Sequence, residues 1–262
     1  MKPVLRFFRF VILNIERNLI KRLTFLLFFF LIQHNLIVAQ VPQPLILDKT
    51  LSPYASANTL ITLHKGIYTY EESYLKPKMF NETGLVLKGS GILYRLGKTV
   101  LIDNIIDGMV GLAQHEVFGH GFRYREFGYK DASYHLNFFP PFGDAHGWAS
   151  SGNAESGRLV SKHEGITKVL GGNEANAILA NEMTFKWLSR KSINYRESIL
   201  YLGAFHNLSS YIIRTKYFNK FKWGGDIDSY IFDINSNEGN LNKTYNIDYL
   251  VKQVYIDFLN PF

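Results

Sequence analysis

The sequence of 262 residues contains no cysteine. Disulfide bonds therefore cannot stabilise the fold, and no thiolate is present to bind a metal or to act as a nucleophile. The sequence also lacks an uninterrupted apolar run of about 20 residues, the length that spans a bilayer as a helix. A metal site in this chain must be built from imidazole and carboxylate groups.

The first 39 residues are typical of a secretory signal peptide. Six lysines and arginines precede an apolar run at residues 23–31, and a second short run ends in the small residue Ala39. Because Gln33, His34 and Asn35 interrupt the apolar stretch, we expect cleavage near Ala39 rather than a spanning helix. The protein is then exported to the periplasm, the cell envelope or the medium. An uncleaved N-terminal anchor with membrane association is the alternative.

The charge balance gives no case for nucleic-acid binding. The chain has 29 basic and 22 acidic residues. The leader holds six of the basic residues and one of the acidic ones, so the remainder is close to neutral. We therefore expect no nucleic-acid partner.

The strongest functional pattern is the hexapeptide HEVFGH at residues 115–120. Two imidazoles can hold a divalent metal, and a neighbouring carboxylate can take a proton from water. Zinc peptidases place such histidines at positions i and i+4 of a helix, where they share a face. Here the spacing is i+5, which on a regular helix turns the second ring about 140° away. A single wide π-helical turn at Gly119 brings the rings back together.

The motif, followed by Gly121, resembles the HExxGH sequence of the dipeptidyl-peptidase III family of zinc exopeptidases. The resemblance implies that His115 and His120 bind Zn²⁺, that Glu116 is the general base, and that a glutamate on a downstream helix is the third ligand. The string GNEANA at residues 172–177 lies at a similar distance and makes Glu174 the expected third ligand. The match is confined to these short segments, and Ile178 stands where the wider pattern has a histidine-orienting aspartate.

Other side chains stay open as third ligands or as supporting groups. The alternative ligands are His146, His163, Glu155, Glu164 and Glu182. Asp107 lies eight residues before His115, close to the same helical face. It is either a carboxylate that orients His115 or a solvated or capping group.

A second resemblance is to the intramembrane site-2 proteases. The segment HEVFGHGFRYREFG at residues 115–128 is similar to their His-Glu-x-Gly-His motif and the helix that follows it, with one residue inserted. The resemblance implies a metalloprotease within the membrane. Charged residues such as Asp103, Asp107 and Arg123 flank the motif, and charges are costly inside a bilayer. We therefore place this interpretation second.

Periodicity along the chain predicts a mainly α fold of the α+β class, with a helical zinc-peptidase-like core and a few N-terminal strands. Residues 40–97 are expected to be an extended or β lead-in, with strands at 60–70 and 85–91. Residues 98–262 are expected to form a helical metal-binding domain. Its predicted helices cover residues 98–127, 173–191, 195–216 and 246–259, and its predicted loops cover 131–157 and 219–244.

These patterns together predict an exported zinc-dependent peptidase acting on a peptide or protein substrate. Zinc would activate a water molecule, and Glu116 would take its proton and return it to the leaving amine. A metal-dependent hydrolase of another amide or ester is one alternative. A non-catalytic envelope protein with a degenerate metal site is the other.

Overall fold

The computed structural model describes residues 45–74, 85–138, 140, 142–152, 161–218, 225–237 and 246–257. The expected leader at residues 1–39 and the candidate ligand Glu155 lie outside these described residues. Every element below belongs to Pro44–Phe262, one of two compact units in the chain. Within the described ranges, no helix combines the length and apolar character needed to cross a membrane.

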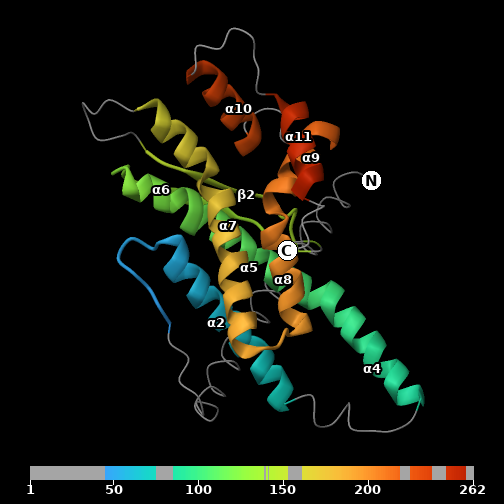
Figure 1. Ribbon diagram of the computed structural model, residues 1–262. Coiled ribbons are helices and arrows are strands. Elements are labelled where there is room, and N and C mark those ends of the chain that lie inside the picture. The colour runs from blue at the N-terminus through green and yellow to red at the C-terminus, as the bar shows by residue number, and fades with distance from the viewer. Residues whose placement is uncertain are drawn as a thin grey trace, which may run out of the picture. The chain divides into compact units, whose positions relative to one another are not determined.

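The fold is mainly α, as predicted (Figure 1). Its helices are α2 (Pro53–Tyr74), α4 (Leu85–Lys98), α5 (Asn104–His115), α6 (Gly121–Glu126), α7 (Lys162–Arg190), α8 (Tyr195–Phe205), α9 (Asn207–Phe218), α10 (Asp226–Asn237) and α11 (Ile247–Asp257). Two π-helical segments, η1 (Thr99–Asp103) and η2 (Glu116–His120), join α4 to α5 and α5 to α6. The stretch from α4 to α6 therefore runs as one continuous rod.

The strands expected in residues 40–97 are not formed. Residues 60–70 lie inside α2, and residues 85–91 begin α4. The β-branched and aromatic composition suggested strands, but the buried positions of α2 recur at helical spacing. Its buried face includes Ala57, Ile61, His64 and Tyr68. This i, i+4, i+7 spacing lets one face of α2 pack against the core. The burial of that face outweighs the β propensity of the β-branched and aromatic residues, so the segment is helical.

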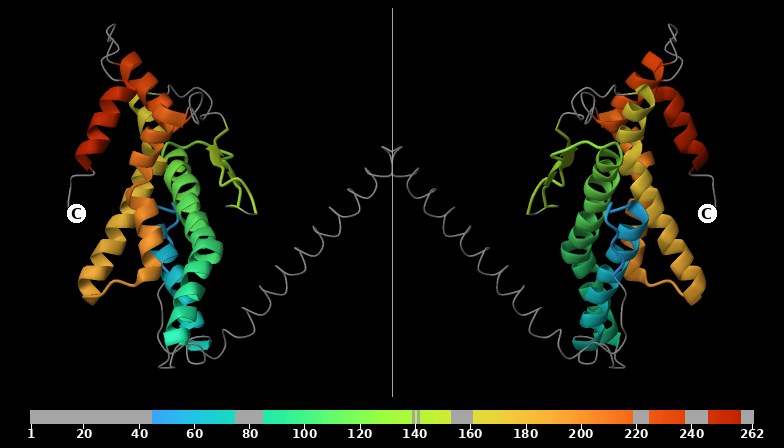
Figure 2. Two further views of the ribbon diagram at one scale, coloured as in Figure 1. Left: turned by 90° about the vertical axis from the view of Figure 1, so that its right-hand side faces the viewer. Right: turned by 90° about the vertical axis from the view of Figure 1, so that its left-hand side faces the viewer.

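The strands within the described residues are β1 (Ser133–Leu136) and β2 (Gly147–Ser150). They pair antiparallel, with Tyr134 opposite Ala149. This hairpin falls in the segment expected to be a loop, residues 131–157, and Figure 2 shows it extending to one side of the helices. It matters for function because β2 packs against η2.

The described residues form two separate apolar cores. The first joins α2, α7 and α8 through Leu179, Met183 and Leu200. The second joins α9, α10 and α11 through Ile227 and Val254. The helices predicted at 173–191, 195–216 and 246–259 correspond to α7, to α8 with α9, and to α11. The helix α10 was missed, because its aspartate, serine and asparagine residues are weak helix formers and it lies in the predicted loop 219–244.

Candidate metal centre

The π-helical turn predicted at the motif is present as η2. His115 ends α5 and His120 ends η2, and both side chains are buried. Their Nε2 atoms lie 3.2 Å apart. The extra residue of the i+5 spacing is therefore absorbed in the backbone, and the two imidazoles converge as two ligands of one metal must.

Two glycines allow α7 to pass close to the motif. A Cβ atom on Gly119 would lie 2.6 Å from the carbonyl oxygen of Gly171, and a Cβ atom on Gly172 would collide with the imidazole of His115. Non-bonded carbon atoms pack at about 3.5–4.0 Å. The approach of α7 to η2 therefore depends on glycine at both positions.

The carboxylate of Asp226, at the first residue of α10, completes the cluster. Its Oδ2 atom lies 3.1 Å from Nε2 of His115 and 3.4 Å from Nε2 of His120. A tetrahedral zinc ion with bonds of about 2.0–2.1 Å places neighbouring ligand atoms roughly 3.3 Å apart. The spacing of the three atoms fits that geometry. Two histidines, one carboxylate and an open fourth position are also the composition of a catalytic zinc site.

The second ring nitrogen of each histidine faces α7. Nδ1 of His120 lies 2.7 Å from the carbonyl oxygen of Lys168, to which it can donate. Nδ1 of His115 lies 3.4 Å from the side-chain amide of Asn176. Tyr211 stacks on the His115 ring, with 5.7 Å between ring centroids and 10° between planes. Both rings are thus held with Nε2 directed into the cluster.

His120 and Asp226 shift each other's pKa values. Burial opposes the imidazolium form of His120, but the hydrogen bond and charge of Asp226, with Glu116, raise the pKa of His120 to about 9. Burial also opposes ionisation of Asp226, yet the two histidines hold the pKa of that carboxyl well below its usual range. The site is therefore arranged to hold positive charge beside an ionised carboxylate, a requirement that a divalent cation meets.

Glu116 lies beside the cluster and is buried. Burial raises the pKa of the Glu116 carboxyl, and the neighbouring His115 and His120 oppose this rise. The hairpin packs against Glu116, because a Cβ atom on Gly147 of β2 would lie 3.2 Å from the Cγ atom of Glu116. A carboxylate whose pKa is moved towards neutrality can both accept and return a proton, which is the role expected from the motif.

The structure does not bring Glu174 to the two histidines. Its side chain is exposed on α7 and its carboxylate pairs with Arg123. The buried neighbours Asn173 and Asn176 face the cluster instead. The carboxylate that joins the histidines is Asp226, which the sequence reasoning missed. The available signal was an acidic residue directly after the Gly-Gly pair at residues 224–225, but nothing in the local sequence separates it from other acidic residues.

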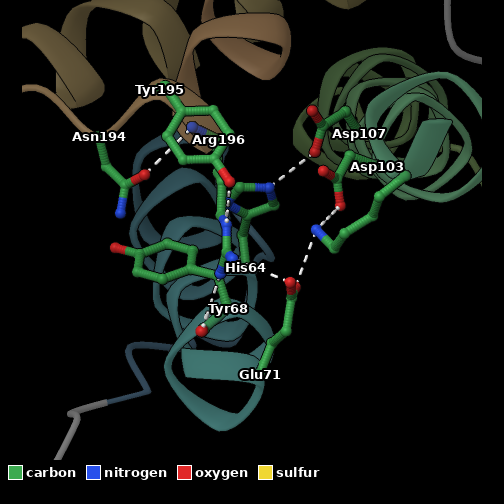
Figure 3. A network of polar contacts seen from close by, with 9 residues as sticks. His64, Tyr68, Glu71, Asp103, Asp107, Asn194, Tyr195 and Arg196 are labelled. Atoms are coloured by element: carbon green, nitrogen blue, oxygen red, sulfur yellow. Dashed lines mark hydrogen bonds and ion pairs between the residues drawn. The ribbon is translucent and has the colours of Figure 1, made fainter. Parts of the chain in front are cut away.

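The remaining candidates within the described residues do not place a ligand atom in the group formed by His115, His120 and Asp226. Asp107 does not orient His115, because its Oδ1 atom pairs with Nε2 of His64 at 2.7 Å (Figure 3). The other proposed ligands occupy different positions: His146 and His163 are exposed, Glu182 accepts a hydrogen bond from Asn58, and Glu164 is in the first turn of α7. The cluster is therefore His115, His120 and Asp226, with Glu116 beside it.

No family model, curated protein or solved structure matches the chain. The likeness to zinc peptidases is therefore confined to the motif at residues 115–120.

Proposed function

We propose that the chain is a zinc-dependent hydrolase that cleaves peptide bonds. The observation that carries the proposal is the convergence of three ligand atoms from His115, His120 and Asp226 at tetrahedral spacing. When bound, zinc would supply a Lewis acid that lowers the pKa of water from about 15.7 towards 7. Glu116, buried beside the cluster, would take the proton of the attacking water and deliver it to the leaving amine.

A mostly apolar pocket that meets the cluster at Asn173, and whose wall also holds Glu174 and His206, would suit a substrate with an apolar side chain. It has a volume of about 440 Å³, and its wall includes Leu170, Phe205 and Leu208. Asn173 lines the same pocket and donates from Nδ2 to Oδ2 of Asp226 at 3.3 Å. One residue thus links the pocket wall to the metal cluster. The side chain of Asn173 would then separate a substrate side chain bound in this pocket from Asp226.

The ligand set is tested by metal content. Protein purified without chelator would be compared with the variants His120→Ala, Asp226→Asn and Glu174→Gln. We expect near-stoichiometric zinc in the wild type and in Glu174→Gln, because Glu174 pairs with Arg123 at the surface. We expect zinc to be lost from the other two variants. Zinc lost from Glu174→Gln but kept in Asp226→Asn would overturn the ligand assignment.

The catalytic part is tested separately with Glu116→Gln. Removing a positioned acid–base group slows such reactions by about 10²–10⁴-fold, whereas the metal ligands stay unchanged. We therefore expect Glu116→Gln to bind zinc like the wild type but to lose cleavage of a peptide library. Equal cleavage by both proteins would remove Glu116 from the mechanism. A zinc-loaded wild type that cleaves esters but no peptides would favour a different hydrolase.

A further inference from the structure

The tautomer of His115 follows from the direction in which its ring points. Its Nε2 atom lies within 3.1–3.2 Å of Oδ2 of Asp226 and Nε2 of His120. To bind a metal there, Nε2 must present a lone pair, so the proton of the neutral ring has to be on Nδ1. A buried N–H group needs an acceptor, and Nδ1 faces Asn176.

Asn176 supplies that acceptor if its amide is turned. The residue is 2 % exposed. Nδ2 of its amide lies 3.4 Å from Nδ1 of His115, while its Oδ1 atom is buried without a hydrogen-bond partner among the described residues. Two N–H groups would then face each other while an acceptor stays unused. Rotation of the amide by 180° exchanges oxygen and nitrogen without moving other atoms, and it satisfies His115.

We infer that Asn176 is a positioning residue, which accepts the Nδ1 proton of His115 through Oδ1 and so fixes Nε2 as the metal-binding atom. The inference rests on the proposed zinc site. It assigns a role to the string at residues 172–177 that differs from the expected one. The glutamate of that string faces solvent, whereas the asparagine two residues later holds a ligand.

The same helix supports the other two ligands. The carbonyl oxygen of Lys168 accepts from His120, and Asn173 donates to Asp226. Lys168, Gly172 and Asn176 are spaced by four residues, so they form one stripe of α7 along the motif. Asn176 is the member of this stripe whose side chain acts on a ligand, so it can be tested by substitution.

The experiment compares Asn176→Leu, which removes the acceptor at similar size, with Asn176→Asp, which keeps an acceptor. Asn181→Leu, on an exposed position of the same helix, is the matched control. Zinc affinity would be measured by competition with a chelator of known affinity. Loss of such an outer partner costs about 10–100-fold in metal affinity. We expect that loss in Asn176→Leu, near wild-type affinity in Asn176→Asp, and no change in the control.

A second measurement separates positioning from a general packing effect. The long-range ¹H–¹⁵N spectrum of zinc-loaded wild type and of Asn176→Asp should show His115 protonated at Nδ1. The Nδ1 proton signal should also move downfield in Asn176→Asp, because a carboxylate is a stronger acceptor than an amide oxygen. This shift decides the question if Asn176→Leu does not fold, and an unmoved signal would overturn the inference. Unchanged affinity in Asn176→Leu would overturn the inference while leaving the zinc site intact. Protonation of His115 at Nε2 in the zinc-loaded wild type would overturn the inference together with the assignment of Nε2 of His115 as a ligand atom. A wild type that binds no zinc would instead remove the proposed function on which the inference depends.

Discussion

The described part of the chain includes two groups of histidine and carboxylate side chains, and they differ in how their atoms meet. In the cluster of His115, His120 and Asp226, three ligand atoms point at one another at 3.1–3.4 Å. In the second group, Nε2 of His64 and Oδ1 of Asp107 form a single pair at 2.7 Å. The first arrangement leaves a centre where one ion can sit, and the second does not.

The surroundings of the second group reinforce this contrast (Figure 3). Positive and negative side chains alternate there, so that each charge meets an opposite one. The pairs are Lys98 with Asp103 at 2.5 Å, Lys98 with Glu71 at 2.8 Å, and Arg196 with Glu71 at 2.9 Å. Such pairing is a way for a helical protein to bury charge. Buried histidine and aspartate side chains therefore indicate a metal site only where at least three potential ligand atoms converge on one point.

The largest expected effect comes from truncating one histidine in each group. His120→Ala should abolish tight zinc binding, because it removes one of three ligands. His64→Ala should keep stoichiometric zinc but lower the free energy of unfolding by about 3 kcal/mol or more, because it leaves Asp107 as an unpaired buried carboxylate. Elemental analysis and chemical denaturation of both variants check this. If His64→Ala folds normally but loses zinc, the second group must contribute to metal binding, and the contrast between the two groups would be wrong.

A smaller effect is expected from the close approach that shapes the first group. Gly172→Ala places a methyl group against the His115 ring and should destabilise the protein by about 2–3 kcal/mol. Gly111 of α5 has no atom within 4 Å of its added Cβ, so Gly111→Ala should stabilise by about 0.5–1 kcal/mol. Denaturation curves of the zinc-free proteins compare them directly. Equal stability of the two variants would contradict the tight crossing of α7 and η2.

Local sequence was sufficient for one half of the site and insufficient for the other. The i+5 spacing with Gly119 predicted the π-helical turn, because all atoms involved lie within two turns of one helix. Asp226 lies 106 residues after His120, and its approach depends on how α10 packs on α7. The side of α7 that faces the motif also decides that Asn176 points inward and Glu174 outward. Tertiary packing of this kind leaves no local pattern.

The mainly α fold was also predictable, because helical periodicity is visible within each segment of the sequence. That periodicity did not exclude the strand or hairpin predicted at residues 60–70. Helical periodicity is a property of the segment, and in α2 it is carried partly by polar buried residues such as His64. A pattern that counts apolar residues alone misses these positions. The strand prediction at residues 60–70 came from their β-branched and aromatic residues, and the role considered for Asp107 came from its spacing to His115. Neither local pattern shows that His64 of α2 and Asp107 of α5 pair with each other.

The smallest expected effect concerns acid stability, and it comes from Glu197, a buried carboxylate that is linked to His64 of the second group through Tyr68. Burial opposes ionisation of Glu197, but hydrogen bonds from Arg190, Trp187 and Tyr68 hold the pKa of that carboxyl below its usual range. A carboxyl with a lowered pKa in the fold contributes stability above the unfolded pKa of about 4.3, and this contribution is lost as the pH falls through the folded pKa. Glu197→Gln should therefore cost about 1 kcal/mol at pH 7, since Arg190 is partly exposed. The difference from the wild type should shrink as the pH falls below about 4.3. Unfolding of zinc-free protein between pH 7 and pH 3 measures it, and a difference that stays constant over that range would show that Glu197 stabilises by packing rather than by charge.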